Sequence, residues 1–283
     1  MTAEDTARSA SDHQRIERLL HDALAIADTW RVRGRWSDAL TLLRGLPPLV
    51  RESGDKATAH QCLSIGRILT DMATFGGMDT RDEREIALDH ALRYAEASGQ
   101  ASLIGDVCDA KGMSLHVMYL ESDRSHELDE ELPFFERGLA LRQQRGEHAA
   151  IAESLFHVGL VYGVVRNDHA CALPYFEDAY RRATDVHDPI TASYAIRHIA
   201  FAHAAAGDIP AALSALHESL RLREAADFIP GVAMACMVLA YPYTETGDKA
   251  TAAHFLERAK DIFESLDASR RVTEVNHRLA QLR

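Results

Sequence analysis

Apolar residues recur every three to four positions through most of the chain, in segments that come in pairs. The clearest pair lies between Ala152 and Asp188. Its first segment reads A-E-S-L-F-H-V-G-L-V-Y, and its second reads A-C-A-L-P-Y-F-E-D-A-Y-R-R-A, with a short polar stretch at 166–168 between them. A period near 3.6 residues is typical of an amphipathic helix. Each pair of segments therefore predicts an antiparallel helical hairpin.

The paired pattern repeats along the chain, about every 40 residues. It returns at 199–220 and at 239–259, each time with Gly-Asp between the two segments. One small residue recurs near the middle of each first segment, because only a small side chain lets paired helices pack about 8–10 Å apart. These small residues are Ala27, Gly66, Gly112, Gly159, Ala200 and Ala240. The spacing predicts turns near Gly34, Asp168, Gly207 and Gly247.

These units resemble tetratricopeptide repeats, whose first helix carries L-G-x-x-Y and whose second carries A-x-x-x-F-x-x-A. Gly159 fits the first pattern, and Ala172, Phe176 and Ala179 fit the second. The period exceeds the usual 34 residues of the family and is similar to that of sensor arrays in bacterial regulators. The resemblance implies an all-α, right-handed superhelical solenoid. We expect a flexible tail over residues 1–14, about six hairpins over 15–266 and a capping helix over 267–283.

Composition and charge narrow the class of partner. The chain has 283 residues, with 43 acidic against 31 basic side chains and a net charge of −12. Such a surface repels a phosphate backbone, so we expect no nucleic-acid partner. We find no apolar run of about 18 residues and no signal peptide at the polar start, and we expect a cytoplasmic protein with no membrane span.

The four cysteines show no metal-binding spacing. Cys62, Cys108 and Cys236 fall at the position where the resemblance implies a buried side chain, and we expect Cys171 to be similar. The acidic run at 121–131 lacks the glycine of a calcium loop and predicts a solvated loop between helices.

Candidate ligand residues follow from the resemblance, which implies that one stripe of each first helix faces a concave groove. In this stripe the middle repeats are acidic, arginines stand on either side, and the C-terminal end is aromatic and rich in methionine. We expect a partner protein, a peptide or an elongated small molecule with a cationic group to bind there. The residues predicted to contact it are Arg67, Asp106, Asp109, His116, Glu153, Tyr194, Arg197 and Tyr241.

Three interpretations of this groove stay open. Arg67 and Arg197 neutralise the acids in a solvated groove, or the groove recognises a ligand, or His116 and the central carboxylates perform acid–base chemistry. A divalent metal is disfavoured, because Asp109 and His116 lie seven residues apart, about 10 Å along a helix. We find no phosphate-binding loop and no hydrolase motif, so no cofactor is expected. A closed cavity around the acids favours chemistry, and an open trough favours peptide binding.

Overall fold

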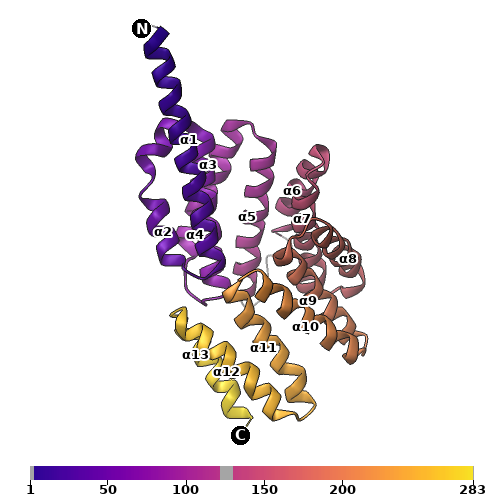
Figure 1. Cartoon of the computed structure of the whole chain (residues 1–283). Helices are drawn as coiled ribbons and strands as arrows, with labels where there is room; N and C mark the ends of the chain where they lie inside the picture. The colour runs from indigo at the N-terminus through magenta and orange to yellow at the C-terminus, as the bar shows by residue number, and fades with distance from the viewer. Residues whose placement is uncertain (1–2, 122–129, 283) are drawn as a thin grey trace.

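The computed structural model describes residues 3–121 and 130–282, and these residues form thirteen α-helices and no β-strand. The helices run antiparallel in sequence order and wind into a superhelix (Figure 1). Their bounds are α1 Ala3–Val32, α2 Trp36–Arg44, α3 Pro47–Thr74, α4 Arg81–Ser98, α5 Ala101–Glu121, α6 Leu132–Arg145, α7 His148–Leu160, α8 His169–Asp185, α9 Pro189–Ala205, α10 Ile209–Ala225, α11 Ile229–Glu245, α12 Lys249–Ser265 and α13 Ser269–Gln281.

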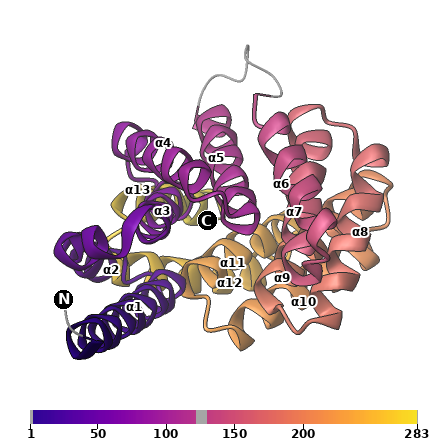
Figure 2. The same ribbon diagram turned by 90° about the horizontal axis from the view of Figure 1, so that it is seen from above.

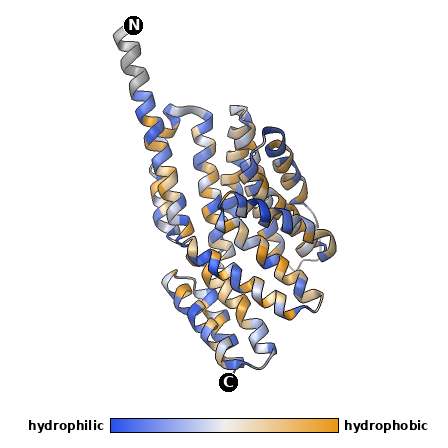
Figure 3. Cartoon of the chain, turned by 45° about the vertical axis from the view of Figure 1, so that its right-hand side comes forward, coloured by the Kyte–Doolittle hydropathy of each residue, from blue (hydrophilic) through white to orange (hydrophobic). Residues whose placement is uncertain are grey.

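The odd-numbered helices α1 to α11 each pair with the helix that follows, which gives the six expected hairpins, and α13 packs on α12 as the cap. The small residue of each first helix lies where prediction put it. A Cβ atom on Gly112 would stand 2.4 Å from the Phe135 ring, and one on Gly159 would stand 2.6 Å from the Phe176 ring. Apolar and polar residues alternate along every helix (Figure 3), so each hairpin buries one face against its neighbours.

The Gly-Asp turns have a simple physical basis. Gly207 and Gly247 adopt left-handed backbone angles, with φ of 81° and 80°, which cost glycine little. The aspartate that follows each glycine caps the next helix. Asp208 accepts a hydrogen bond from the backbone N–H of Ala211, and Asp248 accepts one from Thr251. The predicted turns at Gly34, Asp168, Gly207 and Gly247 are all confirmed.

Two boundaries differ from the expected ones. Helix α1 begins at Ala3, so residue 15 is not an element boundary in the structure. Helix α3 contains Gly54 at φ 80°, which divides a short N-terminal segment from the long helix that carries Gly66. Most of the acidic run at 121–131 lies outside the described residues. Of its described ends, Glu121 is the last residue of α5 and Glu131 is the N-cap residue of α6.

The superhelix closes on itself, which the repeat pattern alone did not predict. The Phe75 ring packs edge-to-face on Phe228, with 5.3 Å between ring centres. Arg271 of α13 donates hydrogen bonds to the carbonyl oxygens of Thr74 and Phe75, and Arg33 forms an ion pair with Asp227 at 2.6 Å. We call these contacts the closing contact. Seen from above, the helices surround a central space (Figure 2).

One expectation about hydropathy is wrong. Within the described residues, the stretch His148–Val165 is long and apolar enough to cross a membrane by length and composition. It forms α7 and the π-helical segment Val161–Val165, and 67% of it is buried inside the solenoid. This stretch is apolar because α7 is a core helix, covered by the helices on both of its sides.

The four cysteines are free thiols. Cys108 and Cys236 are buried as expected, and Cys62 is partly buried. Cys171 is exposed, contrary to expectation, because it lies in the first turn of α8 beside the capping residue Asp168.

Candidate functional site

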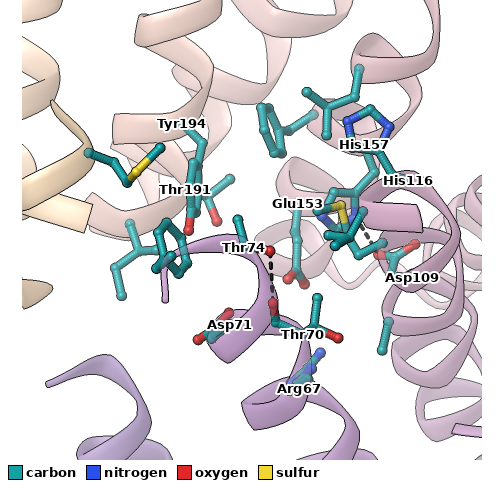
Figure 4. A pocket seen from close by; sticks show the side chains of 18 of the residues that line it. Arg67, Thr70, Asp71, Thr74, Asp109, His116, Glu153, His157, Thr191 and Tyr194 are labelled. Atoms are coloured by element: carbon teal, nitrogen blue, oxygen red, sulfur yellow. Dashed lines mark hydrogen bonds and ion pairs between the residues drawn. The ribbon is translucent and has the colours of Figure 1, made fainter. Parts of the chain in front are cut away.

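A cavity of about 390 Å³ lies at the centre of the superhelix. Its wall comes mainly from the odd-numbered helices α1 to α9, and the closing contact contributes Phe75 and Phe228. Most of the lining surface is apolar, with Met113 and Phe156 among the contributors. Figure 4 shows the polar residues that enter this wall, including Glu153, which projects from α7 toward Thr70 and Thr74 of α3.

Six of the eight predicted ligand residues line the cavity. They are Arg67, Asp109, His116, Glu153, Tyr194 and Arg197. Asp106 lies behind the wall, where it binds Arg142. Tyr241 lies outside the cavity with 62% of its surface exposed, although Met234 of the same helix, α11, lines the cavity. The structure therefore brings the first six residues together around the cavity and leaves Tyr241 apart.

The acids at the centre are neutralised by Arg142, a residue of the second helix α6 that sequence reasoning missed. Its guanidinium is buried and forms ion pairs with Asp109, with Asp106 at 2.7 Å and with Glu153 at 3.4 Å. It also donates to the carbonyl oxygen of Ala150, at 2.9 Å. Burial disfavours the charge of Arg142, but the three carboxylates outweigh burial and raise its pKa.

Arg142 thus shares the role that we expected Arg67 and Arg197 to play, and Arg67 acts on Glu153 as well. Asp109 lines the cavity, but its side chain is only 1% exposed. Asp109 also accepts a hydrogen bond from the Ser154 hydroxyl at 2.8 Å, and its carboxylate lies 3.5 Å from Nδ1 of His157. A ligand ammonium group would have to compete with these partners.

Glu153 is the acid most open to the cavity, with 38% of its side chain exposed. Burial alone would raise its pKa, but Arg67 and then Arg142 outweigh burial and lower that pKa to about 2. Glu153 is therefore ionised at neutral pH.

The opposite wall, from α1 and α3, carries a separate ion pair. Arg31 binds Asp71 at 2.7 Å and Asp28 at 2.8 Å. Both Arg31 and Asp71 line the cavity, so this part of the wall is electrically balanced. Neither residue was predicted as a ligand contact.

His116 contacts an acid that the sequence did not indicate. Its Nδ1 lies 3.1 Å from Oε1 of Glu131, and both side chains are buried. Glu131 stands at the start of α6, just after the residues that the structure leaves out. Because Glu131 already holds one ring nitrogen, His116 faces the cavity as part of a fixed pair.

Arg197, the cation that α9 contributes to the cavity, lacks a carboxylate partner among the described residues. Arg197 lies near the rings of Tyr194 and Phe201, with its Cζ 5.8 Å and 5.9 Å from the ring centres. Its Nη2 lies 3.0 Å from Nε2 of the buried His198, and its Nε has no hydrogen-bond partner. Burial and then Arg197 lower the pKa of His198 well below its usual value, so this ring is a neutral acceptor.

Arg223 of α10 lies directly behind this wall. It is 0% exposed, and its Cζ is 5.1 Å from the Tyr194 ring centre. Its Nη1 donates to the carbonyl oxygen of Gly231 at 2.7 Å, while its Nε and Nη2 have no partner in the described chain. Burial, with Arg197 as the next cause, lowers its pKa to about 9, so Arg223 stays charged at neutral pH.

Metal ligation finds no basis in this geometry. In residues 3–121 and 130–282, no group of three or more His, Cys, Asp or Glu side chains is placed to hold an ion.

Comparisons with known proteins support the fold only. No family model matches the chain, and no curated protein matches it either. Among solved structures, it is similar to BtubC (BKLC) from P. vanneervenii, with a TM-score of 0.50 and 15% identity over 88% of this chain and 92% of that one. A Rap protein, solved in complex with Competence and Sporulation Factor, matches with a TM-score of 0.45 and 12% identity, over 94% of this chain and 99% of that chain.

Proposed function

We propose that this chain is a ligand-binding module built from tetratricopeptide-type repeats, which holds an elongated small molecule or the end of a peptide in its central cavity. The observation that carries the proposal is the partly enclosed, mainly apolar cavity of about 390 Å³ with polar groups converging on it. Sites for small ligands have this size and this mixture of surfaces. The acidic composition and the free thiols agree with a cytoplasmic setting.

The partial enclosure limits the mode of binding. An extended peptide lying along an open trough would pass from the acidic centre to Tyr241, but Tyr241 does not line the cavity, whereas Phe75 and Phe228 of the closing contact do. A ligand of a few residues, or a small molecule of similar size, fits the cavity without breaking the contact. Exchange of the ligand would require the Phe75–Phe228 contact or the mouth of the cavity to open.

An enzymatic function was the alternative, for which a closed cavity was the expected feature, and this cavity is only partly enclosed. The candidate acid–base groups also have fixed partners. Asp109 is held by Arg142 and Ser154, and His116 by Glu131. General acid–base catalysis needs a group that can reach the substrate and exchange a proton near the working pH. A binding role therefore fits these residues better.

The test uses N-phenyl-1-naphthylamine, an uncharged dye that fluoresces strongly in apolar sites. We expect saturable binding to the wild-type protein at about one dye per chain. Met113→Trp should abolish that binding, because Met113 lines the cavity and the larger side chain fills it. Tyr241→Ala is the matched control and should leave binding unchanged, because Tyr241 lies outside the cavity.

Loss of binding in Tyr241→Ala but not in Met113→Trp would transfer the site to the open groove. Circular dichroism of both variants checks that helicity is retained. Native mass spectrometry of protein purified under gentle conditions then identifies the natural ligand by its mass.

A further inference from the structure

Two second helices of the solenoid carry an arginine at the same repeat position. Arg142 lies four residues after Gly138 of α6, and Arg223 lies four residues after Ser219 of α10. Both arginines are fully buried. Each donates from Nη1 to a carbonyl oxygen in the first turns of the next helix, Ala150 in one case and Gly231 in the other. The two guanidinium groups therefore occupy equivalent places in different repeats.

The side chains around the two arginines differ at the four other equivalent positions compared below. Around Arg142 the chain supplies Asp106, Asp109, Glu153 and Ser154. The repeat register places Tyr194, Arg197, Met234 and Ala235 at the corresponding positions around Arg223. Three carboxylates and a hydroxyl are thus replaced by a phenol, a second cation and two apolar side chains.

The result is an excess of positive charge at one wall of the cavity. Burying a cation without a counter-ion disfavours folding. Here the fully buried Arg223 and the partly buried Arg197 lie beside the same ring, that of Tyr194, and Arg197 and Tyr194 both line the cavity. Each also has an Nε–H with no acceptor among the described residues. An anionic oxygen entering from the cavity would meet the Arg197 guanidinium directly, with the charge of Arg223 behind the Tyr194 ring.

We infer that the α9 wall is an anion subsite, and that the ligand of the cavity is an apolar molecule with one anionic oxygen head group, a carboxylate or a phosphate. The inference rests on the proposed function, because it assigns the chemistry of the ligand in the same cavity. Arg197 binds the head group, and Arg223 and the Tyr194 ring hold the positive charge in place. The apolar body of the ligand lies against Met113, Phe156 and the closing contact.

The opposite walls agree with this direction of binding. Asp109 of α5 is paired with Arg142 and Asp71 with Arg31, while Glu153 of α7 stays partly exposed to the cavity. An anionic head group would be repelled by Glu153 and attracted by Arg197, and so would orient toward α9.

The experiment measures displacement of N-phenyl-1-naphthylamine by three eight-carbon compounds: octanoate, octyl phosphate and 1-octanol. In the wild type, an anionic compound should displace the dye at a concentration at least about tenfold lower than 1-octanol, although the alcohol is the more hydrophobic. Octanoate acting at the lower concentration identifies a carboxylate head group, and octyl phosphate acting there identifies a phosphate.

Arg197→Gln should raise the concentration of the anionic compound that displaces the dye about tenfold or more. The concentration of 1-octanol that displaces the dye should stay unchanged. The matched control is Arg221→Gln, which removes the same charge from the outer surface of α10, where Arg221 pairs with Glu218. Arg221→Gln should leave the displacement of the dye by both compounds unchanged. If Arg197→Gln does not fold, the wild-type comparison of the three compounds decides the question.

Equal displacement by the alcohol and the anions in the wild type would overturn the anion subsite, as would an unchanged anion affinity in a folded Arg197→Gln. Both results leave binding in the cavity intact. Failure of the dye itself to bind the wild-type protein would instead overturn the proposed function, and the subsite with it.

Discussion

The two equivalent arginines, Arg142 and Arg223, should respond oppositely to the same substitution. In Arg142→Met, the buried carboxylate of Asp109 loses its cation, and breaking a buried pair in this way costs about 3–5 kcal/mol of the free energy of unfolding. Asp106 and Glu153 are 33% and 38% exposed, so water replaces much of what they lose, and each adds about 0–1 kcal/mol. The expected total is about 3–7 kcal/mol.

Arg223→Met removes a cation that has no carboxylate partner in the described chain. It costs one hydrogen bond to the carbonyl oxygen of Gly231, but it also removes the penalty of an unpaired buried charge. We expect a change within about 1 kcal/mol of zero, or a gain in stability, in protein without ligand.

Urea denaturation followed by circular dichroism at pH 7 measures both effects as shifts of the unfolding midpoint. Arg142→Met should shift it strongly to lower urea, and Arg223→Met should hardly shift it. Similar losses of stability in the two variants would refute the argument from buried charge, because both substitutions remove the same side-chain volume at the same repeat position. The wild type measured in parallel shows whether unfolding occurs in one step.

Three further outcomes follow from the packing and the charges. Gly159→Leu should destabilise the protein by about 1–3 kcal/mol or more, seen as a lower melting temperature, because its Cβ would stand 2.6 Å from the Phe176 ring. The Glu153 carboxylate has a pKa lowered to about 2, so its contribution to stability is present above its unfolded pKa and is lost as the pH falls from about 4.5 to about 2. Acid titration monitored by circular dichroism measures this loss, which should shrink in Arg142→Met. Among the thiols, Cys171 should react with a thiol reagent in the native protein, and Cys236 should react only after unfolding, as mass spectrometry of the labelled chain would show.

Each of these outcomes has a result that contradicts it. An unchanged melting temperature in Gly159→Leu would mean that the helices of this hairpin can separate freely. Gly105→Ala is its control, since a Cβ there meets its nearest atoms at an ordinary 3.6 Å. If the wild type and Arg142→Met unfold in acid with the same pH profile, the ion pair between Glu153 and Arg142 does not contribute to stability. Native labelling of Cys236 would place that thiol outside the core.

The sequence predicts the hairpins well because their signal is local. A small residue such as Gly159 and the large residue opposite it, Phe176, lie in one repeat and obey one helical period. The stripe that faces the cavity follows from the same register, which is why Glu153 and Arg197 were found.

The features of the fold and of the site that the sequence did not predict depend on contacts between repeats. Arg142 was missed because it belongs to a second helix, and only its long side chain reaches the acids of the first helices. Its match in repeat position to Arg223 was the one available signal. Tyr241 was assigned to the site because the register ignores the closing contact, which depends on the cumulative curvature of the whole array.

The closing contact also fixes the number of repeats. Helical arrays whose ends are free can gain or lose a hairpin by duplication or deletion, since each unit touches only its neighbours. Here Arg271 bonds to the carbonyl of Phe75 across 196 positions of sequence. A seventh hairpin inserted between them would carry Phe228 past Phe75, and removal of one would leave the two rings short of each other. The number of hairpins between Phe75 and Arg271 is therefore set by a geometric condition, the meeting of the two ends.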